Sequence, residues 1–393
     1  MNVKSYTILI HYSEIALKKN NRSFFENIFI KNIKIHLTGL PYSSIKLVAA
    51  RIFINGVDNN LLPQYKKRLK NVMGLKNATI MLETKSNLED IKDAAISLIK
   101  EKEFKNFRVT TKRHDKQLEF DSQDSNIFIG DCIRRKSNKP VNLDNPDCNV
   151  IIELLKHKSF IGYDRLLGYS GLPANCQEKA ISLISSGIDS PIASFEMIKR
   201  GVSLDYIHFH SYPSTNQQSI ENVKKILNVL SQYQLKSKLY LVPLLEIQQY
   251  IMQNIPDKYW VIFFRRFMIK ISCDVAKNNN AVALVTGDSI GQVASQTLSN
   301  IRAISDVSNF PIIRPLSGYN KEDIVNRAKN IGTYEISIEP YEDCCSFFVP
   351  PHPETKAKME QVELLDKMLN MDEIYKQTIN RIEELKIKYL ESS

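Results

Sequence analysis

The sequence predicts a multidomain protein in which an α+β half precedes an α/β half built on a doubly wound parallel sheet. The chain of 393 residues is about twice the length of a typical domain. Residues 1–170 mix short strands with amphipathic helices, whereas from residue 171 short apolar strands alternate with helices. Alternation of this kind is typical of parallel sheets, because each parallel crossover needs a connecting helix.

Composition narrows the class of protein. With 43% hydrophobic and 24% charged residues, the chain is an ordinary globular one. No uncharged apolar run approaches 18 residues, and the polar N-terminus does not resemble a secretory signal. We therefore expect a cytoplasmic protein with no membrane partner. The net charge of +10 favours a polyanion such as nucleic acid if the positive residues are clustered.

The six cysteines predict neither a disulfide scaffold nor a zinc site, because no pair is spaced C-x-x-C. We therefore expect no protein-bound metal. The pair Cys344 and Cys345 differs from the other cysteines because the two are adjacent. Neighbouring thiols on one loop are more typical of redox or sulfur chemistry than of a structural role.

The first 74 residues predict a small α+β unit. Strands are expected at 5–12 and 47–54, and helices at 20–37 and 62–72. This arrangement would bury one face of a short sheet beneath two helices.

Residues 75–170 form a second predicted unit, and the positive side chains gather here. Strands are expected at 77–83, 107–113 and 149–155, with an amphipathic helix at 88–102. The candidate contacts to a nucleic-acid backbone are Lys112, Arg113, Lys116, Arg134 and Arg135. Acidic residues are interspersed among them, so a plain solvated face is the alternative.

The α/β half predicts where a ligand would bind. Strands are expected at 180–185, 204–210, 239–244 and 281–287, and a final amphipathic helix carries Val362, Leu365 and Leu369. Ligands of such sheets bind at the carboxyl ends of the strands. That edge should carry three segments, residues 185–190, 208–212 and 286–291.

One segment at this edge has the chemistry of an anion site. Ser185-Ser186-Gly187-Ile188-Asp189-Ser190 lies between the first strand and the first helix. Small residues at a helix N-terminus leave backbone N–H groups free to bind an anion. The segment is not a Walker A loop. A helix N-cap at Ser190 is the structural alternative.

ISLISSGIDSPIASFEMIKRG resembles the PP-loop of ATP pyrophosphatases and, more narrowly, that of the tRNA 4-thiouridine synthetases, the ThiI family. The blocks IHFHSYP, FFRRFM, LVTGDSIGQVASQTLSNI, IIRPLSGYNKEDI and YEDCCSFFVPPHPETK follow in the order of that family. HYSEIALKKNNRSFFE resembles its ferredoxin-like extension, and FRVTTKRHDKQLEFDSQDSNIFIGDCI resembles its tRNA-binding THUMP domain.

The resemblance implies three domains. A ferredoxin-like domain would occupy residues 1–74, an α/β THUMP domain residues 75–170, and a PP-loop domain with an adenine nucleotide alpha hydrolase-like sheet residues 171–393. Some family members append a rhodanese domain, for which the chain leaves no room. Family members also supply sulfur for the thiamine thiazole through that extra domain.

The resemblance also implies the reaction and its participants. ATP with Mg²⁺ would adenylate O4 of uridine 8 in tRNA, and sulfur would then displace AMP to give 4-thiouridine. The sulfur would come from an external donor, either a persulfide carrier such as a cysteine desulfurase or free sulfide. A homodimer is implied, and an Fe–S cluster is not expected.

The resemblance also implies which residues form the site, because each family position can be matched to a residue of this sequence. The implied ATP-binding residues are Leu183, Ile184, Ser185, Ser186, Gly187, Ser190, His208, Phe209, Arg265, Gly287 and Gln296. The implied catalytic residues are Asp189, Lys321, Cys345 and Cys344, with Cys345 the first candidate for carrying sulfur. Lys321 opens a helix, where the dipole disfavours a cation, so we expect it to have an anionic partner.

One departure from the family pattern leaves alternatives open. The family's SGGIDS reads SSGIDS here, with Ser186 in place of the first glycine. If that position required a positive φ, serine would weaken ATP binding. The alternatives are a different PP-loop chemistry and a tRNA-binding protein whose ATPase has decayed.

Overall fold

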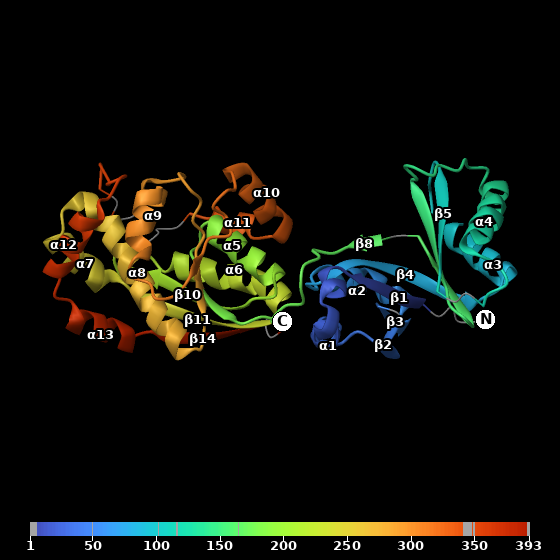
Figure 1. The fold of residues 1–393 in the computed structure, drawn as a ribbon, viewed down its shortest axis with the longest axis horizontal. Coiled ribbons are helices and arrows are strands. Elements are labelled where there is room, and N and C mark those ends of the chain that lie inside the picture. The colour runs from blue at the N-terminus through green and yellow to red at the C-terminus, as the bar shows by residue number, and fades with distance from the viewer. Residues whose placement is uncertain are drawn as a thin grey trace. The chain divides into compact units, whose positions relative to one another are not determined.

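The computed structural model describes residues 6–48, 50–100, 102–114, 117–163, 165–340, 348 and 350–390. Contacts divide the chain into two compact units, Met1–Pro173 and Ala174–Ser393. In Figure 1 the first unit runs from blue to green and the second from green to red. None of the described helices is long and apolar enough to cross a membrane.

The first unit is built on one eight-stranded sheet, with the order β2-β3-β1-β4-β7-β6-β5 and β8 beside β4. Its elements are β1 (Tyr6–Tyr12), η1 (Glu14–Leu17), η2 (Lys19–Asn21), α1 (Arg22–His36), β2 (Ser44–Val48), β3 (Arg51–Val57), η3 (Asn59–Leu61), α2 (Leu62–Lys70), β4 (Leu75–Lys85), α3 (Leu88–Ile99), β5 (Phe107–Arg113), α4 (Ser122–Ser137), β6 (Cys148–Leu154), β7 (Lys158–Gly162) and β8 (Arg165–Leu167).

The long strand β4 joins the two halves of this sheet. Its first part pairs with β1 from Leu75 to Leu82, and its last four residues pair with β7. The strand therefore belongs to both of the small units that the sequence predicts. A second core lies under α3 and α4, where Ile91, Phe107 and Ile129 are buried together.

The first unit has more elements than the sequence predicted, and strands β7 and β8 are two of them. The single strand expected at 47–54 is two antiparallel strands, β2 and β3, and Ala50 between them has a left-handed φ of 65°. Helix α4 was not predicted. Its signal was a capping box, in which the side chains of Asp121 and Asp124 each bond to the other's backbone N–H.

The second unit confirms the predicted doubly wound sheet. The strand order is β13-β12-β9-β10-β11-β14, and the first five strands are parallel. Its elements are β9 (Lys179–Leu183), α5 (Asp189–Lys199), β10 (Ser203–His210), α6 (Gln218–Gln234), β11 (Lys236–Pro243), α7 (Leu245–Asn254), η4 (Asp257–Tyr259), α8 (Trp260–Asn278), β12 (Ala283–Val285), η5 (Ala294–Gln296), α9 (Leu298–Ser305), β13 (Ile312–Ile313), α10 (Lys321–Ile331), α11 (Tyr334–Ser337), α12 (Met359–Met368), α13 (Asp372–Asn380) and β14 (Glu383–Lys388).

Helices cover both faces of this sheet (Figure 1). Alternate side chains of β9 show the two faces: Ile181 joins the core built by α7 and α8, whereas Ser182 is hydrogen-bonded to Ser194 of α5 at 2.9 Å. The sheet is therefore buried on both sides, and its strand ends remain as the place for polar side chains.

The C-terminal prediction was wrong in part. Val362 and Leu365 are buried in α12 as expected, but the helix ends at Met368, before Leu369. The chain continues into α13 and then β14, which pairs antiparallel with β11 at the edge of the sheet. Ile387 and Leu385 alternate with charged residues, a period-two pattern that distinguishes a strand from a helix.

Candidate active site

The loop between β9 and α5 is held in shape by its own hydroxyl groups. The backbone N–H of Ser185 donates to Oγ of Ser190 at 2.8 Å, and Oγ of Ser190 lies 3.2 Å from the Ser185 carbonyl oxygen. The N–H of Gly187 donates to Oγ of Ser185 at 3.4 Å. These contacts tie the strand end to the first turn of α5, whose dipole makes this loop a suitable place for an anion.

Ser186, the departure from the family pattern, is accommodated without strain. Its φ is not in the left-handed region, so the backbone does not require glycine here. The side chain is fully buried, and its Oγ has no hydrogen-bond partner in the described part of the chain. The loop therefore keeps its shape with serine, and backbone strain gives no reason to expect weaker ATP binding.

Asp189 and Lys321 form an ion pair where the loop between β9 and α5 meets the helix. Nζ of Lys321 lies 2.7 Å from Oδ1 of Asp189, and Nε2 of Gln292 donates to Oδ2 at 3.0 Å. Lys321 is the first residue of α10 and Asp189 the first of α5. The expected anionic partner of Lys321 is therefore Asp189, 132 residues away in the sequence.

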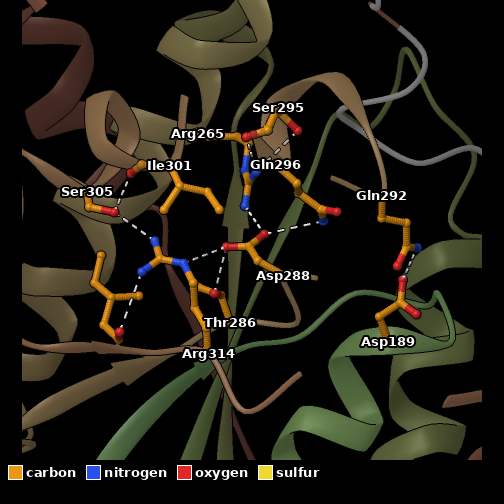
Figure 2. Close-up of polar contacts among 11 residues, drawn as sticks. Asp189, Arg265, Thr286, Asp288, Gln292, Ser295, Gln296, Ile301, Ser305 and Arg314 are labelled. Carbon is orange, nitrogen blue, oxygen red and sulfur yellow. Dashed lines mark hydrogen bonds and ion pairs between the residues drawn. The ribbon is translucent and has the colours of Figure 1, made fainter. Parts of the chain in front are cut away.

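A second carboxylate, Asp288, lies at the centre of a buried polar cluster that sequence reasoning did not identify (Figure 2). Its Oδ1 accepts from Arg265 and, at 3.5 Å, from Nε2 of Gln296; its Oδ2 accepts from Thr286 at 2.8 Å and from Nε of Arg314 at 3.1 Å. Burial alone would raise the pKa of Asp288, but Arg265, Thr286 and Arg314 together hold it below its usual value.

Gly287 connects the two carboxylate clusters. A Cβ atom built on Gly287 would lie 2.7 Å from the backbone N of Ser190 and 2.8 Å from its Cα. Only a residue without a side chain allows the end of β12 to approach the first turn of α5 this closely. The loop after β12 is therefore packed directly against the PP-loop-like turn.

Three of the four predicted strand-end residues are buried, and Leu183 is half-buried. Phe209 and Leu183 pack in the core on the α8 face, and Ile184 is buried. His208 is buried as well, with Nδ1 2.9 Å from the Ile184 carbonyl oxygen, and burial lowers its pKa to about 4. This histidine is neutral, so it is not a source of positive charge for a phosphate.

Four of the five predicted nucleic-acid residues lie on β5 and α4 of the first unit. Lys112 is exposed, and Arg113 donates to the Leu118 carbonyl oxygen at 2.7 Å. Arg134 and Arg135 are exposed at the end of α4, and both pair with Asp131. Lys116, Cys344 and Cys345 lie outside the described residues.

Three functional candidates were missed from the sequence: Asp288, Arg314 and Gln292. Each lies in a block quoted for the resemblance, but none stands out by residue type in an otherwise polar loop. The signal that could have found Asp288 is its place directly after a buried strand and a glycine, where a carboxylate faces the strand edge.

A parallel sheet with a hydroxyl-rich loop and a lysine at its carboxyl edge defines a nucleotide-binding α/β protein of the PP-loop class. Family models match three consecutive segments: the ThiI ferredoxin-like domain at residues 7–79, the THUMP domain at 85–164, and "Thiamine biosynthesis protein (ThiI)" at 175–371. The chain belongs to the ThiI family.

Curated relatives agree over nearly the full length. A probable tRNA sulfurtransferase of Thermoanaerobacter sp. (strain X514) is 39% identical over 378 residues, 96% of this chain and 98% of the relative. One from Bacillus pumilus (strain SAFR-032) is 36% identical, covering 97% of this chain and 96% of the relative. A crystal structure of a 4-thiouridine synthetase–RNA complex with bound ATP is 34% identical, with a TM-score of 0.89 over 98% of this chain and 100% of that one.

Proposed function

We propose that this chain is an ATP-dependent tRNA sulfurtransferase that makes 4-thiouridine in tRNA. The observation that carries the proposal is the turn at residues 185–190, whose hydroxyl groups close on the N-terminus of α5 beside the Asp189–Lys321 pair. A helix N-terminus and a lysine suit a triphosphate, and the similar structure with bound ATP and RNA supports the assignment.

The reaction needs an activated oxygen, because O4 of uridine is a poor leaving group. We propose that O4 attacks the α-phosphorus of ATP, breaking its bond to pyrophosphate. The turn at 185–190 would bind the departing pyrophosphate, and Lys321 would neutralise its charge. Mg²⁺ would supply further neutralisation, with Asp189 the carboxylate at this helix end able to hold it. Sulfur then adds to C4, and AMP leaves.

The sulfur step is assigned to the cysteine pair. Cys345, with Cys344 as the second candidate, would receive sulfur as a persulfide from an external donor, or sulfide would attack C4 directly. With a persulfide, its terminal sulfur bonds to C4 as AMP leaves. A second thiol then attacks the cysteine sulfur, which forms a disulfide and releases 4-thiouridine, and an external thiol reduces that disulfide before the next turnover. With sulfide, no thiol is oxidised.

The tRNA is proposed to bind along the exposed cations of β5 and α4. Lys112, Arg134 and Arg135 would contact phosphates, which gives affinity that falls as salt rises. The exposed pairing of Arg134 and Arg135 with Asp131 is weak, so phosphate can replace that carboxylate at little cost. We propose that a homodimer in the cytoplasm carries out the reaction, as the family resemblance implies.

The decisive experiment is a thiolation assay. Purified protein is incubated with unmodified tRNA, Mg-ATP and sulfide, and the absorbance band of 4-thiouridine is followed. We expect thiolation by the wild type and its loss in Asp189→Asn. Asp372→Asn is the matched control, because Asp372 is likewise the first residue of a helix, α13, in the same unit. Absence of thiolation by wild-type protein that binds tRNA would overturn the proposal.

The cysteine roles are tested in the same assay with a persulfide donor in place of sulfide. Cys345→Ser should abolish thiolation, whereas Cys132→Ser, in α4 of the first unit, should not. If Cys344→Ser abolishes thiolation and Cys345→Ser does not, the two roles are exchanged.

A further inference from the structure

The strongest unassigned feature of the second unit is the cluster around Asp288, which contains two arginines and one carboxylate. Asp288, Arg265 and Arg314 come from three separate segments: the loop after β12, helix α8 and the segment after β13. The side chain of Asp288 is 6% exposed, and those of Arg265 and Arg314 are 18% and 15% exposed. The cluster carries one excess positive charge, although little of it is in contact with water.

We infer that Asp288 is a positioning residue that orients Arg265 and Gln296 toward ATP; this inference rests on the proposed function. Asp288 contacts both side chains through the same oxygen, Oδ1 (Figure 2). Arg265 comes from α8 and Gln296 from η5. Nη1 of Arg265 also donates to the carbonyl oxygen and Oγ of Ser295 in η5, at 3.4 and 3.2 Å, so α8 and η5 are joined both directly and through the carboxylate of Asp288.

Asp288 also fixes which way the amide of Gln296 points. An ionised carboxylate only accepts hydrogen bonds, so Gln296 must present Nε2 to it and turn Oε1 away. Oε1 is buried and has no hydrogen-bond partner among the described residues. A buried acceptor without a partner is costly, and an N–H or O–H group of a bound nucleotide would satisfy it.

Arg314 has a different part in the cluster. Its Nε donates to Asp288 at 3.1 Å, its Nη2 to Oγ of Ser305 at 2.7 Å, and its Nη1 to the Ile312 carbonyl oxygen at 3.5 Å. These bonds direct Arg314 into the protein. It therefore anchors Asp288, and Arg265 keeps the nucleotide contact that the family resemblance implies for it.

The location agrees with a phosphate site. Asp288 follows Gly287, where an added Cβ would lie 2.7 Å from the backbone N of Ser190 in the first turn of α5. The backbone that carries Asp288 is therefore packed beside the helix N-terminus that we assign to the triphosphate. A helix N-terminus and an arginine bonded to this loop are both suited to bind phosphate.

The experiment measures the dissociation constant of ATP for the full-length protein by calorimetric titration. Asp288→Asn removes the negative charge and leaves the shape nearly unchanged. If Asp288 positions Arg265, ATP binding weakens by about tenfold or more, because a charge-assisted hydrogen bond to phosphate is misplaced. If Asp288 only neutralises charge, its loss makes the site more positive, and ATP binds more tightly. Tighter or unchanged binding therefore overturns the inference.

The control variant is Asp306→Asn, which removes an exposed carboxylate that lies 3.8 Å from the buried Arg266 in the same unit. It should leave ATP binding unchanged. The affinity for tRNA should be unchanged in Asp288→Asn, and an equal loss of both affinities would indicate general unfolding and overturn the inference. Thr286→Val, which removes the 2.8 Å bond to Asp288, should weaken ATP binding in the same direction by a smaller factor.

A double-mutant cycle separates positioning from independent action. In an Arg265→Ala background, Asp288→Asn should weaken ATP binding by a smaller factor than in the wild type, because only its contact with Gln296 is left to act through. Additive effects would overturn the inference. If the wild type does not bind ATP, the proposed function fails; if it binds ATP and the cycle is additive, only the role of Asp288 fails.

Discussion

Gly287 offers the sharpest test of how the site is assembled, because its role depends on a distance. In Gly287→Ala the new Cβ would lie 2.7 Å from the backbone N of Ser190 and 3.1 Å from the carbonyl carbon of Asp189. These are backbone atoms at the start of α5, which no rotamer change can move away. Either the loop after β12 or the N-terminus of α5 must shift.

The expected cost follows from overpacking a buried contact, about 1–3 kcal/mol. For a folding unit of roughly 200 residues, each kcal/mol lowers Tm by about 2–4 °C. We therefore expect Gly287→Ala to lower Tm by about 2–12 °C. Because the displaced atoms belong to the proposed phosphate site, ATP affinity should fall as well.

The matched control is Gly318→Ala. Gly318 is in the same unit, is exposed, and would have nothing within 4 Å of an added Cβ. Alanine there should be neutral or stabilising by about 0.4–1 kcal/mol, since it restricts the unfolded chain. Differential scanning calorimetry and ATP titration compare the two variants. If Gly287→Ala matches Gly318→Ala in both measurements, the close approach has no role and the reasoning is refuted.

Three further predictions concern single side chains. Ser186→Ala should raise Tm, because it removes a buried hydroxyl that has no hydrogen-bond partner among the described residues, and burying such a group costs about 1 kcal/mol; a lower Tm in calorimetry would contradict this. Lys321→Ala should weaken ATP binding by titration, whereas Lys329→Ala in the same helix should not; equal effects would argue against a specific phosphate contact. Burial lowers the pKa of His36 to about 3, so the folded state keeps it neutral while the unfolded chain binds a proton below about pH 6.5. Stability should therefore fall between about pH 6.5 and 3, and urea midpoints should depend less on pH in His36→Gln; an unchanged pH dependence would exclude His36 as the cause.

Periodicity was enough to predict the parallel sheet of the second unit, because strands buried on both faces read as apolar runs between amphipathic helices. It failed at β14, where a short exposed edge strand follows two helices and its alternation covers only six residues. It also failed at β2 and β3, because a left-handed turn at Ala50 has no glycine or asparagine to indicate it.

Part of the candidate site could likewise be predicted from the sequence, and part could not. The 185–190 loop could be predicted, since its chemistry lies within six consecutive residues. The Asp288 cluster could not be predicted, because it forms only when Arg265, Gln296 and Arg314 contact one carboxylate from separate elements. The partner of Lys321 was expected to be an anion, but only the fold shows that this anion is Asp189.

The two carboxylates of the site are held by cations in different ways, and the difference matches their proposed roles. Lys321 and Asp189 are 48% and 22% exposed, so water screens their attraction and the pair is worth about 1 kcal/mol or less. An incoming phosphate can therefore take Lys321 from Asp189 at little cost. Asp288 is buried between two arginines, and breaking a buried pair costs about 3–5 kcal/mol. Asp288 is therefore suited to hold side chains in place, and Asp189 to exchange its partner when substrate binds.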